Sequence, residues 1–186
     1  MFTHTFIAVL TLSLVALPCV AEDKVVERQP VQHRVTGLFS PDRENDLREV
    51  LKTLPDVKLV SVDYKTSEAT FLYDADKLLS RPKPEEIPER LDNLLRSASQ
   101  STFGIRPLCL IPKDKLKWIE IPVAGLDCKA CCLAAYESVY KIDGVEQATA
   151  SFKDGLVTAF VNPEKTNRAA LEAALKARGV TLKLEQ

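Results

Sequence analysis

The sequence contains little histidine and no excess of positive charge. Only two of its 186 residues are histidine, and 25 basic residues stand against 26 acidic ones, for a net charge of −1. Because no basic surplus is present, we expect no nucleic-acid partner. The chain also lacks a Ser/His/Asp set, a phosphate-binding loop and a paired-carboxylate cleft, so we predict that the protein is not an enzyme.

A long apolar run is absent as well. Residues 6–20 are apolar or small and uncharged, but a membrane-spanning helix needs about 20 such residues. Cys19 and Ala21 place small residues at the −3 and −1 positions of a cut before Glu22. Although no Lys or Arg precedes the run, the pattern predicts a signal peptide over residues 1–21 and export to the periplasm or the exterior. An uncleaved anchor is the alternative.

Five cysteines are present, and Cys19 would leave with the signal peptide. The other four are Cys109, Cys128, Cys131 and Cys132. Four cysteines in an exported chain are enough for two disulfides. Three of the four lie within five residues, however, which is more typical of a site than of a structural framework.

The crowded cysteines lie on a predicted strand-to-helix turn. An apolar strand-like run precedes them, and the helical run 133–140 follows. At a helix N-terminus the free N–H groups and the positive end of the dipole favour thiolate over thiol. Thiolate is both the metal-binding and the nucleophilic form, so the turn is the candidate site.

The order of predicted elements occurs twice. After a polar linker over residues 22–30, the hydrophobic periodicity predicts strand, helix, hairpin, helix and strand within residues 31–112, and again within residues 116–186. In the first of these units a helix is expected over 46–54 and a closing strand over 103–110. The fold class is therefore α+β, with two ferredoxin-like β-α-β-β-α-β units in tandem after the signal peptide.

The two units align without a gap at an offset of 88 (125 − 37 = 88), which places Gly37 on Gly125. At this offset Ser40 and Arg43 occupy the positions of Cys128 and Cys131. Neither Ser nor Arg is a soft-metal ligand. The first unit is therefore expected to serve as a spacer, a docking surface or a partner module rather than as a second copy of the site.

The second unit resembles the heavy-metal-associated (HMA) domain, found in copper chaperones, metal-pumping ATPases and periplasmic mercury-binding proteins. The family's Gly-Met-Thr-Cys-x-x-Cys motif reads Gly-Leu-Asp-Cys-Lys-Ala-Cys here, from Gly125 to Cys131. The first unit resembles the family only through the repeat. The resemblance implies a metal carrier or scavenger. A carrier would pass its ion to a partner, such as a membrane metal transporter or another metal-accepting protein.

The residue chemistry agrees with a soft-metal site. Two thiolates, Cys128 and Cys131, suit a low-coordinate ion such as Cu(I) or Hg(II), whereas Zn(II) prefers four ligands. Asp127 would favour a divalent ion as a ligand, or would cap the following helix instead. Cys132 is either a third thiolate or, as we favour, a core residue. Arg178 would lie near the turn by family resemblance and neutralise the complex, or would cap its own helix.

Two other functions compete with metal carriage. The first is a thiol–disulfide oxidoreductase that uses the same pair, although Lys129 and Ala130 do not match the thioredoxin motif. The second is a non-catalytic interaction module. Elsewhere in the chain, Cys109 is expected to be a buried core thiol in a strand, and His33 a partly buried structural histidine.

Overall fold

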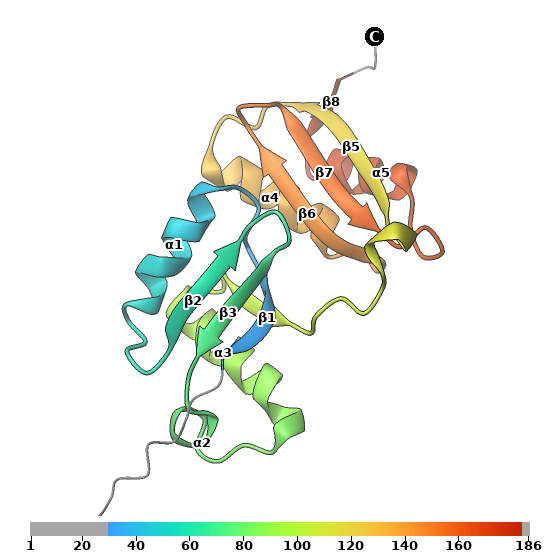
Figure 1. Ribbon diagram of the computed structural model, residues 1–186. Coiled ribbons are helices and arrows are strands. Elements are labelled where there is room, and N and C mark those ends of the chain that lie inside the picture. Colours follow the sequence, from blue (N-terminus) through green and yellow to red (C-terminus); the bar gives the residue numbers. More distant parts are fainter. Residues whose placement is uncertain (1–29, 184–186) are drawn as a thin grey trace, which may run out of the picture.

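The computed structural model describes residues 30–183 and contains two α+β units that follow one another along the chain (Figure 1). The predicted signal peptide over residues 1–21 lies outside the described residues. Among the residues described, no helix is both long and apolar enough to cross a membrane. The first unit consists of β1 (Val31–Thr36), α1 (Asp42–Leu51), β2 (Lys58–Asp63), β3 (Glu68–Leu72), α2 (Ala75–Leu78), η1 (Pro84–Glu86), α3 (Ile87–Ala98) and β4 (Gly104–Arg106).

The second unit repeats this order without the counterparts of the two short helices. After the 3₁₀ turn η2 (Lys113–Lys115), it consists of β5 (Lys117–Ala124), α4 (Lys129–Tyr140), β6 (Val145–Ser151), β7 (Leu156–Val161), α5 (Arg168–Ala177) and β8 (Thr181–Leu182). The sheet orders are β2-β3-β1-β4 and β6-β7-β5-β8, and all the pairs are antiparallel. Two ferredoxin-like units in tandem are thus confirmed.

The predicted offset of 88 extends to individual backbone hydrogen bonds. The N–H of Val35 donates to Ser67 at 2.7 Å, and the N–H of Val123, 88 positions later, donates to Gly155 at 2.8 Å. Both acceptor residues have positive φ angles, 56° and 61°. Because a one-residue slip would reverse which side chains face the core, matching bonds of this kind fix the alignment of the two units.

Several predicted boundaries were wrong. The first helix begins at Asp42, four residues before the predicted start, and the closing strand ends at Arg106 instead of reaching residue 110. Pro107 follows Arg106 and has no N–H to donate, so it interrupts the ladder. Helix α2 was not predicted.

Each unit has its own hydrophobic core, and one residue of the first unit packs in the core of the second. Phe39 belongs to the first unit by sequence but packs, 3% exposed, in the core of the second. The predicted structural role of His33 is confirmed, because it is buried on the β1 face that also carries buried Val35 and its Nε2 lies 3.0 Å from the Tyr73 hydroxyl.

The two units are also joined by polar contacts along the edge strand β6. The guanidinium of Arg34 in β1 binds both the side chain and the carbonyl of Glu146, at 2.6 Å and 2.9 Å. The amide of Gln147 donates to the carbonyl of Lys65, at the tip of the β2–β3 hairpin. Figure 1 shows this hairpin pointing towards β6. The contacts therefore cover an edge that would otherwise be open to pairing with another chain.

Candidate metal centre

The cysteine turn is built from a strand end, a glycine and a helix start. Gly125 follows β5 with φ +79°, a conformation that residues with a side chain rarely adopt. Leu126 is buried beneath the turn, which leaves the next residues outside. Cys128 is the N-cap of α4, and its Sγ accepts the backbone N–H of Cys131 at 3.2 Å. The sequence therefore places a thiol directly at a helix N-terminus.

The sulfurs of Cys128 and Cys131 face one another. Their Sγ atoms are 2.7 Å apart, Cys128 is exposed and Cys131 is half-buried. The hydrogen bond from Cys131 lowers the pKa of Cys128, and the same bond raises the pKa of Cys131. These opposite pKa shifts favour Cys128 as the thiolate of the pair. Both sulfurs are within reach of a single ion, since a metal–sulfur bond is about 2.3 Å long.

The two further candidate ligands, Asp127 and Cys132, differ in their surroundings. The predicted capping role of Asp127 was wrong, because the N-cap is Cys128; Asp127 itself is exposed. Cys132 is 3% exposed and packs in the core, and burial raises the pKa of its thiol. Within residues 30–183, no group of three or more His, Cys, Asp or Glu side chains is arranged to hold a metal.

Arg178 lies beside the turn. It follows α5 as its C-cap residue and is exposed. It lines a shallow pocket together with Gly125, Ala130 and Cys131. The structure therefore places a cation in the same pocket as Cys131, near enough to lower the energy of a negatively charged complex.

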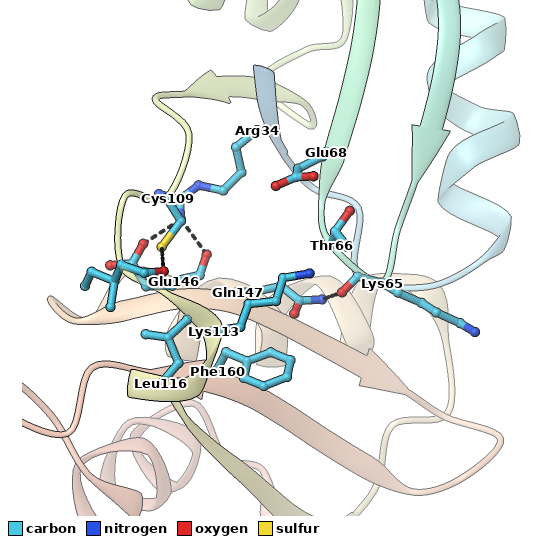
Figure 2. A pocket seen from close by; sticks show the side chains of 11 residues that line it. Arg34, Lys65, Thr66, Glu68, Cys109, Lys113, Leu116, Glu146, Gln147 and Phe160 are labelled. Atoms are coloured by element: carbon cyan, nitrogen blue, oxygen red, sulfur yellow. Dashed lines mark hydrogen bonds and ion pairs between the residues drawn. The ribbon is translucent and has the colours of Figure 1, made fainter. Parts of the chain in front are cut away.

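Cys109 is not the buried strand thiol that was predicted. It lies after β4, outside any strand, and is half-buried, with its Sγ 3.6 Å from the carbonyl of Ile111. Figure 2 shows it beside Arg34 and Glu146 in a pocket of about 140 Å³ between the two units. Burial raises the pKa of this thiol. The prediction failed because Pro107 ended the strand early.

The corresponding turn in the first unit is built differently. Gly37 has the same positive φ, +88°. Arg43 occupies the position of Cys131 but is buried, and its Nε donates to the carbonyl of Gly37 at 3.1 Å. Ser40 has its hydroxyl hydrogen-bonded to Asp42. The first unit thus has the fold of the second, with a guanidinium in place of the second thiol.

Lys129, which lies between the two cysteines, was not singled out by the sequence analysis. Its Nζ lies 2.9 Å from a carboxylate oxygen of Asp42 and 3.4 Å from one of Asp46, both on α1 of the first unit. These residues are more than 80 positions away in sequence. No local pattern indicates a contact that depends on how the two units pack.

A ferredoxin-like unit that exposes a thiol pair at the start of its first helix has the construction of a small metal-binding module. The model of the heavy-metal-associated domain matches residues 34–96. An uncharacterised protein from Haemophilus influenzae is 33% identical over 63 residues, which are 34% of this chain and 68% of that protein. The chain belongs to the heavy-metal-associated domain family.

The family match falls on the first unit, for which the sequence analysis had found only an indirect resemblance. Among solved structures, the N-terminal soluble domains of Bacillus subtilis CopA are 22% identical, covering 86% of this chain and 95% of that one, with a TM-score of 0.35. Oxidized MerP from Ralstonia metallidurans is 21% identical, covering 38% of this chain and 99% of that one, with a TM-score of 0.36.

Proposed function

We propose that this protein is exported and binds one soft metal ion through the thiolates of Cys128 and Cys131, either to carry the ion or to sequester it. The observation behind the proposal is the convergence of two sulfurs, 2.7 Å apart, from exposed Cys128 and half-buried Cys131 at the N-terminus of α4. Membership of the heavy-metal-associated domain family supports metal as the ligand.

The number of thiol ligands at the turn favours a low-coordinate ion. Only two soft ligands converge on the exposed turn, while Cys132 is in the core. Cu(I) and Hg(II) accept two thiolates, whereas Zn(II) would need further ligands from water or a partner. An ion held by two sulfurs at the surface remains open to attack by the thiols of an acceptor. A thiol-bearing acceptor, such as a membrane metal transporter, is the partner this arrangement suits.

Replacement of either sulfur tests the assignment. Cys128→Ser and Cys131→Ser should each abolish tight binding of Cu(I) and Hg(II), measured by competition with a chromogenic chelator under reducing, anaerobic conditions. Cys109→Ala is the control, since its thiol lies between the units beside Glu146 and away from the turn, and it should bind as the unchanged chain does. If either serine variant retained full affinity, the site would be wrongly assigned.

A thiol–disulfide exchange protein is the second candidate, and the closeness of the two sulfurs and the exposure of Cys128 favour it. Loss of two electrons and two protons to an oxidant would join Cys128 to Cys131 and block metal binding. If the reduced chain bound no metal but its thiol pair oxidised and reduced reversibly, the redox function would replace the metal function.

A further inference from the structure

The turn of the first unit that corresponds to the cysteine turn is a contact with the second unit. Phe39, at the position of Asp127, packs with its ring centroid 5.5 Å from that of Tyr136 in α4. The carbonyl of Phe39 accepts the N–H of Ala150 in β6 at 3.1 Å, and the N–H of Gly37 donates to the Tyr136 hydroxyl at 3.0 Å. In the second unit this turn carries the thiols. In the first unit the equivalent turn instead attaches that unit to α4 and β6 of the second.

Arg43, at the position equivalent to Cys131, supports this contact from within the first unit. Its guanidinium lies over the rings of Phe39 and Phe103, at 5.2 Å and 4.5 Å from their centroids. It also forms an ion pair with Asp46. Arg43 therefore holds in place both an apolar group and a carboxylate that reach the second unit.

The carboxylates act on the first residue of α4. Asp42 and Asp46 bind Lys129 from the side of α1, and Lys129 lies directly after Cys128 and two positions before Cys131. Figure 1 shows α1 beside the start of α4. Helix ends fray unless neighbouring groups hold them. In this chain the first turn of α4, which sets the separation of the two sulfurs, is held by another unit.

We propose that the first unit is a built-in positioning partner for the thiol pair. Phe39, Asp42 and Asp46 are positioning residues that fix the first turn of α4 and so keep the two sulfurs convergent, which slows the departure of the ion. The role in metal retention rests on the function proposed above; the role in ordering the turn does not. A unit that has the same fold but no thiols in its turn thereby has a task of its own, and Arg43, at the position equivalent to Cys131, supports that task.

The test uses the full chain and removes the contact from both sides. Asp42→Asn combined with Asp46→Asn keeps the side-chain shapes but neutralises both carboxylates. Lys129→Gln removes the same ion pairs and leaves the Arg43–Asp46 pair intact. Glu49→Gln is the matched control, because Glu49 is an exposed carboxylate on the same helix and pairs with Lys52 rather than with the second unit.

Two readouts are compared. Hydrogen exchange of the backbone amides over residues 128–133, in the reduced metal-free chain, should become about two- to fivefold faster in the Asp pair variant and in Lys129→Gln. Transfer of bound Hg(II) to a competing dithiol should become faster by a similar factor. The variant that combines Asp42→Asn, Asp46→Asn and Lys129→Gln should be no faster than the Asp pair variant, since the three residues form one contact. Glu49→Gln should change neither rate.

The outcomes separate this inference from the proposed function. Unchanged amide exchange in both sets of variants would overturn the positioning role, whether or not the chain binds metal. Faster amide exchange with unchanged Hg(II) transfer would overturn the link to metal retention. Absence of Hg(II) binding by the unaltered chain would instead overturn the proposed function, while the amide readout would still decide whether the first unit orders the turn.

Discussion

Phe39 offers the sharpest test of how the two units depend on one another. Its side chain is 3% exposed and lies in the core of the second unit. A buried Phe covers about 200 Å² of mostly apolar surface, and at about 25 cal/mol per Å² this contributes several kcal/mol. Phe39→Ala removes most of that area, together with the ring contact with Tyr136, and leaves a cavity. The expected cost in unfolding free energy is about 3–5 kcal/mol.

The only tryptophan of the chain makes the measurement specific. Trp118 lies in β5 of the second unit, so its fluorescence reports that unit's unfolding in urea. With a slope near 2 kcal/mol per M, Phe39→Ala should lower the urea midpoint of the Trp118 signal by about 1.5–2.5 M. Phe152→Ala is the control, because Phe152 is 66% exposed, and it should shift the midpoint by less than about 0.3 M. An unchanged Trp118 midpoint in Phe39→Ala would refute the shared core.

Three further predictions concern the site and its surroundings. Cys132→Ala should leave metal affinity unchanged and cost about 1 kcal/mol in urea unfolding, because a small buried group is lost; a loss of affinity equal to that of Cys128→Ser would make Cys132 a ligand. Arg178→Gln should weaken Cu(I) binding about two- to fivefold in chelator competition while changing Hg(II) binding less, since the Cu(I) bis-thiolate complex carries a negative charge and the Hg(II) complex does not; equal effects on both ions would contradict this role. Burial lowers the pKa of His33 below 6.5. The unfolded chain therefore binds the proton first, and the free energy of unfolding should fall as the pH drops below about 6.5. His33→Gln cannot take up that proton and should lose less stability on the same acidification.

The sequence was sufficient for the repeat and for the chemistry of the turn. Hydrophobic periodicity gave both units, and the offset of 88 holds in the bonds of Val35 and Val123. The spacing of Cys128 and Cys131 predicted that they share a helix start, as they do. These features depend on residues close together in the chain, where backbone geometry determines what side chains meet.

Other features depended on contacts that local patterns do not encode. Asp127 is a good capping residue, but the helix begins one position later and Cys128 takes the N-cap. Lys129 is an exposed lysine, and its ion pairs with Asp42 and Asp46 of α1 depend on how the two units pack. Phe39 was a signal in the sequence that the first unit docks on the second. It is a large apolar residue in a turn, at the position equivalent to Asp127, and such a residue at an exposed turn suggests a partner surface.

The central claim is that one soft ion binds to the sulfurs of Cys128 and Cys131. Native mass spectrometry of the reduced, anaerobic chain, titrated with Cu(I), Hg(II) and Zn(II), tests it most directly. The account predicts a single tight equivalent of Cu(I) or Hg(II), which disappears when Cys128 and Cys131 are both replaced by serine. Retention of that equivalent by the double variant, or no binding of any of the three ions by the unaltered chain, would contradict it.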